Sequence, residues 1–506
     1  MIIKGGRILK TIKRELINGV KITLISKYSN VLVQIILGII LARLLSPEEF
    51  GVAAVIMILV TFFSLLADMG IGPAVIQHKQ LSKGDIERIF FFSVILAFIL
   101  GLIFLLCADL IAFFYKNKIY IQMARYLSIN IMFFTMLIVP KAIITRNKNF
   151  TVIGIVEVGV NIIAGTVAVI LALKGASYYS IIVKSIITSM LAFLLYYKFA
   201  KIRFRIPSLY NMKKSLKKIM EFSIFQFFFN VINYFSRNMD NILIGKYMGL
   251  KALGFYDISY KLMLYPITTF RQVLNPVIVP VLKDYQDDHI NVYKTYKKIL
   301  LVLTTVGAML SVMLYFTAYE IIFILYGKQW LGSVPVFEIL AFSIGIQMAL
   351  SSAGSIFQVV GCTKELFLSG VLGSFIMLIA IVVGVMQQNL IAVAICVVTG
   401  YCLDFFLAFY ILIKCVLKQS FMDFLLNLIK PILFMIIMGG FMSFSRMIAY
   451  ENVYLLFFIK LMMGGVGMII GLFVTGLTKD LGMLLMKERK PTLTSNVNLG
   501  GAYEKI

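Results

Sequence analysis

The most regular feature of the chain is a succession of apolar runs about 20 residues long, separated by short polar segments. Because a helix rises about 1.5 Å per residue, each run is long enough to cross the hydrocarbon layer of a bilayer, which is roughly 30 Å thick. Runs such as ILGIILARLL are apolar at consecutive positions, which excludes the alternating pattern of a transmembrane β-barrel. We therefore predict an all-α polytopic membrane protein with 14 transmembrane helices. They are expected within residues 22–44, 50–68, 89–114, 120–143, 151–173, 177–199, 219–245, 252–280, 299–326, 333–360, 365–386, 389–413, 428–448 and 453–477.

Composition agrees with this fold. Of the 506 residues, 61% are hydrophobic and 14% are charged, whereas a soluble domain carries about 25% charged residues. The mean hydropathy is +0.96. These values exclude a water-soluble globule. The five cysteines form no CxxC pair, so neither a disulfide framework nor a zinc site is indicated.

The distribution of basic residues predicts how the chain is oriented in the membrane. Lysines and arginines outnumber acidic residues by 48 to 23, and positively charged loops stay on the cytoplasmic side of a membrane. With the N-terminus placed inside, the inner connections and the two termini hold 33 of these cations and the outer connections hold eight. Both termini are therefore expected in the cytoplasm. Because the charge is spread over successive loops, membrane lipids and not nucleic acid are the expected anionic partner.

The chain ends differ from the apolar core. Residues 1–21 are basic, and Ile8, Leu9, Ile12 and Leu16 share one helical face. This segment is either an interfacial helix or a flexible basic tail. A basic cytoplasmic linker is expected at residues 201–218, and a polar, disordered tail at residues 481–506.

An internal duplication divides the chain. Aligning ILARLLSPEEFG, which ends at Gly51, with LIGKYMGLKALG, which ends at Gly254, gives an offset of 203 residues. The offset also pairs Arg43 with Lys246 and Asn30 with Asn233. Each repeat then holds six helices, and an even number keeps the repeats parallel. We expect six-helix lobes at 22–200 and 219–415, followed by two further helices within 416–480.

Polar residues recur on one face of several predicted helices. In 219–245 they are Asn230, Asn233, Arg237 and Asn241, and in 252–280 they are Asp257, Lys261, Thr268 and Arg271. The offset places Lys27, Asn30 and Gln34 at the positions of Asn230, Asn233 and Arg237. A charge that faces lipid is costly, so these stripes are expected to line a water-filled cleft between the lobes.

The cations on these stripes suit an anionic ligand. Lys27, Arg237, Lys261 and Arg271 could pair with phosphate oxygens, and with Asn30 and Asn233 they form the predicted substrate site. The alternative is that Arg237 with Asp240, and Lys261 with Asp257, form intrahelical ion pairs. Asp68, Asp240 and Asp257 could carry H⁺ or Na⁺, or could serve packing. We expect four other charged residues to snorkel toward the interface, namely Asp109, Arg125, Lys184 and Lys460.

Catalytic signatures are missing from the sequence. It contains no GxxxxGK[ST] phosphate loop, and its two histidines, His78 and His289, fall in predicted cytoplasmic loops. A catalytic triad, a histidine-based metal centre and ATP hydrolysis are therefore not indicated, and we expect a protein that is not an enzyme and has no cofactor.

Two segments resemble a known family. LLSPEEFGVAAVIMILVTFFSLLADMGIGPAVIQHKQLSKGDIERIFFFSVILAF resembles the start of bacterial polysaccharide flippases of the Wzx and WzxC type, in the MOP superfamily. RNMDNILIGKYMGLKALGFYDISYKLMLYPITTF resembles their second half. The resemblance implies two six-helix lobes in a V with two added helices. It also implies a site formed by basic residues lining the cleft, which corresponds here to Lys27, Arg237, Lys261 and Arg271.

The implied function is transport of undecaprenyl-pyrophosphate-linked oligosaccharides across the bacterial cytoplasmic membrane for surface polysaccharide export. A lipid-linked oligosaccharide would be the substrate, and a polymerase or glycosyltransferases would be possible partners. The alternative is a cation-coupled exporter of small amphiphilic molecules, of the drug or toxin type. Those exporters often carry an acidic cation site in the first helix, where this chain has Lys27 and no Asp or Glu. A membrane enzyme of glycan assembly is a further alternative, but the short outer connections disfavour it.

Overall fold

The computed structural model describes residues 25–78, 80–282, 285–448 and 451–480. Throughout these ranges the regular structure is helical. The predicted basic segment at 1–21 and the predicted tail at 481–506 lie outside the described residues. The first half comprises Ile25–Leu44, α2 (Pro47–Asp68), α3 (Ile71–Gln77), α4 (Lys83–Leu106), α5 (Ala108–Tyr115), α6 (Ile119–Arg146), α7 (Phe150–Leu173) and α8 (Tyr179–Ala200).

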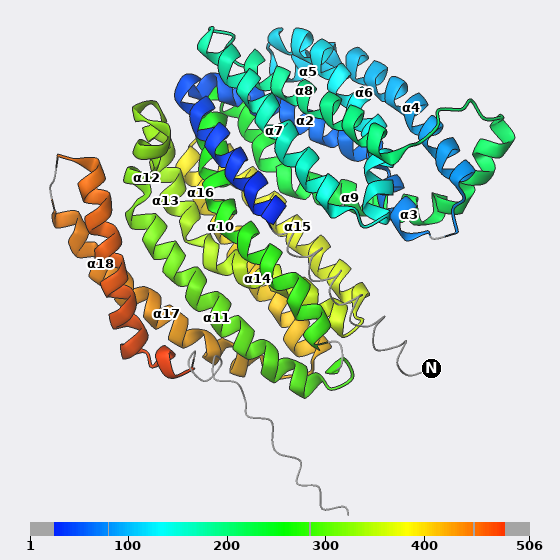
Figure 1. The fold of residues 1–506 in the computed structure, drawn as a ribbon. Helices are drawn as coiled ribbons and strands as arrows, with labels where there is room; N and C mark the ends of the chain where they lie inside the picture. The colour runs from blue at the N-terminus through cyan, green and yellow to red at the C-terminus, as the bar shows by residue number, and fades with distance from the viewer. Residues whose placement is uncertain (1–24, 79, 283–284, 449–450, 481–506) are drawn as a thin grey trace, which may run out of the picture.

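The second half is longer and ends in the two added helices. Its elements are α9 (Leu209–Tyr247), α10 (Leu250–Leu282), α11 (His289–Phe316), α12 (Ala318–Tyr326), η2 (Lys328–Ser333), α13 (Val334–Ala341), α14 (Ser343–Val359), α15 (Thr363–Met386), α16 (Leu390–Tyr410), η3 (Ile411–Val416), α17 (Phe421–Ser443), η4 (Phe444–Met447) and α18 (Val453–Val474). In Figure 1 the blue-to-teal first half and the green-to-orange second half lie beside each other, with α17 and α18 on the outer side of the second.

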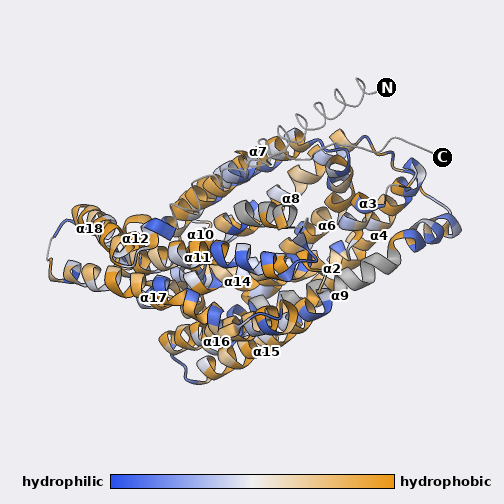
Figure 2. Ribbon diagram, turned by 90° about the horizontal axis from the view of Figure 1, so that it is seen from below, coloured by the Kyte–Doolittle hydropathy of each residue, from blue (hydrophilic) through white to orange (hydrophobic). Residues whose placement is uncertain are grey.

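The described helices confirm a polytopic membrane protein. Eleven of them are long and apolar enough to span a bilayer, or twelve if Lys328–Ala341 and Ser343–Val359, bent by 52°, form one span. The prediction was 14. The difference lies at α9 and α10, which have 39 and 33 residues but are less apolar because they carry the polar stripes. Figure 2 shows that hydrophobic residues dominate the helices and that hydrophilic ones gather in the loops.

Three predicted spans are broken helices. The runs 89–114 and 299–326 are divided at Cys107 and Thr317, so that each becomes a long helix followed by a short one. The same break therefore occurs in the third predicted span of each repeat. The run 333–360 is divided after Ala341. Apolar pattern alone does not reveal these breaks, because both sides of each are equally hydrophobic.

The predicted duplication corresponds to a symmetrical contact where α2 and α10 cross. The offset of 203 residues pairs Gly51 with Gly254 and Pro47 with Leu250. A Cβ atom added to Gly51 would overlap the Leu250 carbonyl, and one added to Gly254 would overlap the Pro47 carbonyl. Each glycine thus packs on the backbone that the offset assigns to the other, as a two-fold relation requires.

Near this crossing, side chains of η2 cap the end of the first helix. The last carbonyls of a helix lack partners within it. Trp330 donates its Nε1–H to the Ala42 carbonyl at 2.7 Å, and Gln329 donates through Nε2 to Ala42 at 2.8 Å and Leu45 at 3.1 Å. Arg43 donates through Nε to Leu325 of α12 at 2.9 Å. These bonds, here named the cap contacts, join the first half to the second.

A second junction joins the halves where α4 and α9 begin, at the opposite end of α2. The Asp85 carboxylate caps α4 by accepting from the Ser82 backbone at 3.1 Å. It also accepts from the Ser215 hydroxyl at 2.8 Å and the Lys218 ammonium at 2.7 Å, both on α9. The beginning of α9 is therefore fastened to the beginning of α4.

The added helices are fixed by a buried ion pair. Lys460 of α18 contacts Glu320 of α12 at 2.6 Å and donates to the Phe316 carbonyl at 2.9 Å. The Lys460 side chain is 11% exposed and that of Glu320 is 1% exposed. The expectation that Lys460 snorkels is wrong, because a buried carboxylate and a free helix-end carbonyl are within its reach.

Replacing Gly51 by Ala tests the crossing of α2 and α10. The new methyl group would overlap backbone, which cannot rotate away, so the helices must separate. We expect a loss of about 1–3 kcal/mol in the free energy of unfolding, measured as a lower thermal midpoint in detergent. Gly159→Ala in α7 is the matched control, since its Cβ has no neighbour within 4 Å. Equal midpoints for the two variants would contradict the contact.

Trp330→Phe tests the cap contacts, since it keeps the ring and removes the N–H donor. We expect faster labelling of a single cysteine that replaces Ser64, in the cavity described below, in a protein whose native cysteines have been removed. The label is a membrane-impermeant thiol reagent, added on the side of the membrane where α2 begins. Tyr296→Phe is the control: it removes a buried bond to Ser352 at 2.8 Å within the second half. That variant should lower stability without changing the labelling rate, and equal rates in all three proteins would refute a closing role.

Candidate functional site: a polar cavity between the halves

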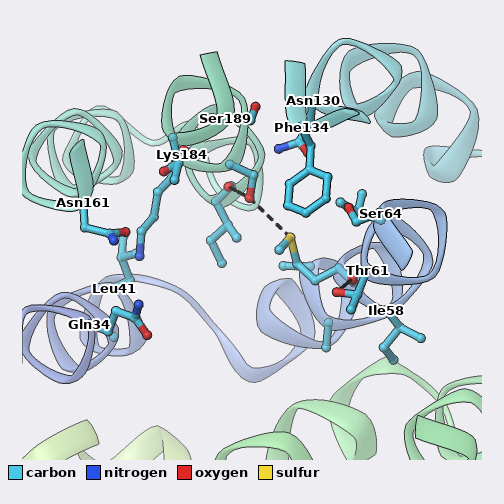
Figure 3. Close-up of a pocket in the computed structure, with 18 of the residues that line it drawn as sticks. Gln34, Leu41, Ile58, Thr61, Ser64, Asn130, Phe134, Asn161, Lys184 and Ser189 are labelled. Atoms are coloured by element: carbon cyan, nitrogen blue, oxygen red, sulfur yellow. Dashed lines mark hydrogen bonds between the residues drawn. The ribbon is translucent and has the colours of Figure 1, made fainter. Parts of the chain in front are cut away.

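A cavity of about 840 Å³ is lined by residues of both halves. The first helix, α2, α6, α7 and α8 line it from the first half, and α9, α10 and α12 line it from the second. Figure 3 shows the part contributed mainly by the first half. The cavity therefore occupies the position between repeats that the polar stripes predicted.

Hydrogen bonds and one ion pair organise the first-half wall. Asn161 of α7 donates from Nδ2 to Asn30 Oδ1 and to the Glu157 carbonyl, each at 2.9 Å. Lys141 of α6 contacts the Glu157 carboxylate at 2.8 Å. Gln34 lies one helical turn from Asn30 on the same face of the first helix. These contacts fix the relative positions of three helices and leave polar edges toward the cavity.

Lys184 is the cation of this wall that lacks an opposite charge. In Figure 3 its side chain extends from α8 into the space beside Asn161 and Gln34. Within the part of the chain that the structure describes, its ammonium group has no hydrogen bond and no ion pair. Lys261 of α10 lines the same cavity from the second half. One lysine from each half thus faces a shared space.

The second-half wall carries an ion pair and a buried amide. Lys261 contacts Asp257 at 2.5 Å, one turn away on α10, so the intrahelical alternative describes this pair. The Lys261 side chain remains 52% exposed, which leaves N–H donors for a ligand. Asn241 of α9 is 7% exposed, and its Oδ1 atom accepts no hydrogen bond from the described residues.

Hydroxyl groups gather where α2 and α8 face each other across the cavity. Thr61 and Ser64 come from α2, and Ser185, Thr188 and Ser189 come from α8. Ser185 also approaches the sulfur of Met57 at 3.3 Å. The wall therefore offers several small polar groups at short range.

Some of the residues predicted to bind the substrate lie together in the cavity, and others do not. Asn30 and Lys261 line the cavity. Lys27 and Arg271 are exposed and do not contribute to its lining. The side chains of Asn233 and Arg237 lie outside the described residues, although α9 itself reaches the cavity through Asn238 and Asn241.

The residues predicted for ion coupling are dispersed. Asp257 lies in the cavity wall, in its pair with Lys261. Asp240 is 4% exposed and accepts from the Tyr256 hydroxyl at 2.9 Å. Asp68 accepts from the Gly72 amide at 3.2 Å at the end of α2. These two carboxylates are absent from the cavity lining.

The sequence analysis missed Lys184, Lys141 and Asn161. Lys184 was expected to snorkel, and Lys141 was not identified as a candidate. A signal was present for the first, because Lys184, Ser185, Thr188 and Ser189 share one helical face of an otherwise apolar run. Nothing in the sequence pairs Lys141 with Glu157, since their helices meet only in the folded chain.

The side chains that line the cavity are of types that can bind a polar ligand. Among the described residues it combines ammonium groups, two carboxylates, amides and hydroxyls, and includes no histidine or cysteine. Within the described ranges, no three His, Cys, Asp or Glu side chains are grouped so that they could hold a metal ion. Ammonium groups bind phosphate oxygens and amides bind hydroxyls, so a phosphorylated, hydroxyl-rich molecule would be complementary.

Comparison with known proteins agrees with this architecture. The family described as "Polysaccharide biosynthesis protein" matches residues 40–335. The lipopolysaccharide biosynthesis protein WzxC of Escherichia coli (strain K12) is 22% identical over 419 residues, which cover 80% of this chain and 84% of WzxC. The teichuronic acid biosynthesis protein TuaB of Bacillus subtilis (strain 168) is 21% identical, over 69% of this chain and 72% of TuaB.

Solved structures share the fold at low sequence identity. The lipid II flippase MurJ in an inward closed conformation gives a TM-score of 0.72 at 14% identity, covering 91% of this chain and 99% of MurJ. An inward-facing multidrug resistance transporter of the MATE family, in the MOP superfamily, gives 0.57 at 14% identity, covering 79% and 95%. The chain therefore belongs to the polysaccharide biosynthesis protein family of Wzx-like membrane flippases, and it has the fold of the MOP superfamily.

Proposed function

We propose that this protein moves undecaprenyl-pyrophosphate-linked oligosaccharides across the bacterial cytoplasmic membrane, for export of a surface polysaccharide. The observation that carries the proposal is the cavity between the halves, which Lys184 lines from the first half and Lys261 from the second. A doubly charged diphosphate between them could pair with both ammonium groups. Its binding would therefore draw the two halves toward each other.

The rest of the lining supports such a substrate. The amides and hydroxyls of both walls could hold the sugars, while the polyprenyl chain remains in the bilayer. The names of two similar proteins are in accord, since WzxC is named for lipopolysaccharide biosynthesis and MurJ for flipping lipid II.

The proposed membrane topology has 14 spans. It adds α9 and α10 to the twelve candidates, which gives two parallel six-helix lobes and the pair α17 and α18. With both termini in the cytoplasm, the cap contacts lie at the outer face, because Arg43, Lys246 and Lys328 belong to outer connections. The structure would then represent a state closed to the outside.

The proposed mechanism is alternating access. The substrate enters from the cytoplasmic side, its diphosphate binds the lysines, and rocking of the halves breaks the cap contacts. The hydrogen bonds of Trp330 and Gln329 are the ones lost on opening. Asp68, Asp240 and Asp257 remain the proposed carboxylates for coupling to an ion gradient.

Lys184→Ala should abolish lipid-linked glycan export, because it removes the cavity cation without a carboxylate partner. A charge-assisted hydrogen bond of about 1.5–3 kcal/mol corresponds to a 10- to 150-fold loss of affinity. Lys184→Arg, which keeps the charge, should retain partial export. Lys198→Ala is the matched control, since Lys198 is exposed near the end of the same helix. Normal export by Lys184→Ala at equal protein levels would reject the assignment.

Lys27, Arg237 and Arg271 are proposed to contribute to substrate binding in another state of the cycle. Single alanine variants of Arg237 and Arg271 should abolish export in cells while the amount of protein in the membrane stays the same, as judged by immunoblot. Unchanged export in both would remove the two arginines from the site and leave the lysine pair as its charged part.

A further inference from the structure

A second cleft, separate from the central cavity, lies between α11 and α17. The two helices run beside each other in the second half (Figure 1). The cleft has a volume of about 400 Å³ and is lined by Lys297, Lys298 and Leu301 of α11, by Leu426, Asn427 and Lys430 of α17, and by Asp480 beyond α18. In the proposed topology α11 and α17 both begin at the cytoplasmic face, and the cleft lies near those beginnings. Its lysines would therefore lie at the level of the lipid headgroups.

The charged groups of this cleft leave a positive excess. Lys297 contacts Asp423 at 2.7 Å, and Lys430 contacts Asp480 at 2.6 Å. Lys298 adds a third ammonium group, so three lysines stand against two carboxylates and one net positive charge remains. An ammonium group has three N–H donors, so a lysine that contacts a carboxylate can still bind another acceptor. A group with a single negative charge, such as a phosphodiester, would balance the cleft.

The apolar part of the cleft continues into the lipid-facing surface of α17. Leu301 is buried, whereas Leu426 is 55% exposed. Leu426 belongs to a row of exposed apolar side chains at helical spacing, here named the α17 stripe, which consists of Met422, Leu426, Ile429, Leu433 and Ile436. Exposed apolar side chains of a membrane-spanning helix contact acyl chains. The lysines of the cleft thus lie beside a surface that suits the chains of a lipid.

We propose that this cleft binds an anionic phospholipid of the cytoplasmic leaflet, with its phosphodiester on the lysines and its acyl chains along the α17 stripe. Basic pockets between transmembrane helices on the cytoplasmic side bind anionic headgroups, whereas a zwitterionic headgroup would bring a further cation among the lysines. The bound lipid would connect α17 to the beginning of α11. The other end of α11 is already attached to α18, where Lys460 donates to the Phe316 carbonyl. The inference goes beyond transport and rests only on the proposed topology.

A tryptophan that replaces Ile429 on the α17 stripe tests the site, because brominated acyl chains quench a tryptophan that they contact. The native tryptophan, Trp330, is fully buried. The purified full-length protein is reconstituted in phosphatidylcholine vesicles with increasing amounts of brominated phosphatidylglycerol or brominated phosphatidylcholine. One charge-assisted hydrogen bond predicts about tenfold tighter binding of phosphatidylglycerol. Leu372→Trp is the matched control, since Leu372 is an exposed residue of α15, outside the cleft, and the two lipids should quench it equally.

Charge variants connect the preference to the cleft. In the Ile429→Trp protein, replacing Lys298 and Lys430 together by Gln should abolish the preference for phosphatidylglycerol, and replacing both by Arg should retain it. Replacing Lys213 and Lys214 by Gln is the matched control, because these two exposed lysines of α9 carry the same charge outside the cleft. That control should keep the preference. Thermal midpoints verify that all variants are folded.

Several results would overturn the inference and leave the flippase proposal standing. These are equal quenching of Ile429→Trp by the two lipids, an equally strong preference at Leu372→Trp, and a preference that survives the loss of both lysines. Two competitors identify the source of the phosphate group. Displacement of the brominated lipid by glycerol 1-phosphate would assign the cleft to a soluble phosphate compound, and displacement by farnesyl diphosphate would assign it to the transported substrate, so either result would overturn a resident phospholipid.

Discussion

The structure depends on one constraint: a charged or polar side chain within a lipid-spanning helix must find a partner or water, since exposure to acyl chains is costly. Three solutions are visible. Lys460 and Glu320 pair in a buried position that attaches α18 to the second half. Asp85 satisfies several donors where α4 and α9 begin. Other polar groups, among them Lys141, Lys184 and Lys261, gather in the cavity between the halves.

Much of the fold follows from the apolar pattern. The predicted spans coincide with described helices, and the offset of 203 residues anticipated the reciprocal packing of Gly51 and Gly254. The helix breaks at Cys107 and Thr317 escaped prediction, because no change in hydropathy accompanies them. Fewer apolar spans are found than were predicted, because α9 and α10 carry the polar faces that had marked them as candidate site helices, and these faces lower their hydropathy.

The candidate site was predictable only in part. Asn30 and Lys261 were identified from the spacing of polar residues along single helices, and both line the cavity. Lys184 was assigned to the membrane interface because an isolated lysine in an apolar run usually reaches water there. Its position opposite Lys261 depends on how α8 packs relative to α10, which no local pattern encodes. The pairing of Lys141 with Glu157 likewise belongs to tertiary structure.

The reciprocal glycines carry an evolutionary consequence. In an ancestor assembled from two identical half-length chains, a single codon would have supplied both Gly51 and Gly254, so any mutation there struck both sides of the axis at once. In the present chain the two positions are encoded separately, yet neither can gain a side chain unless the opposite backbone retreats.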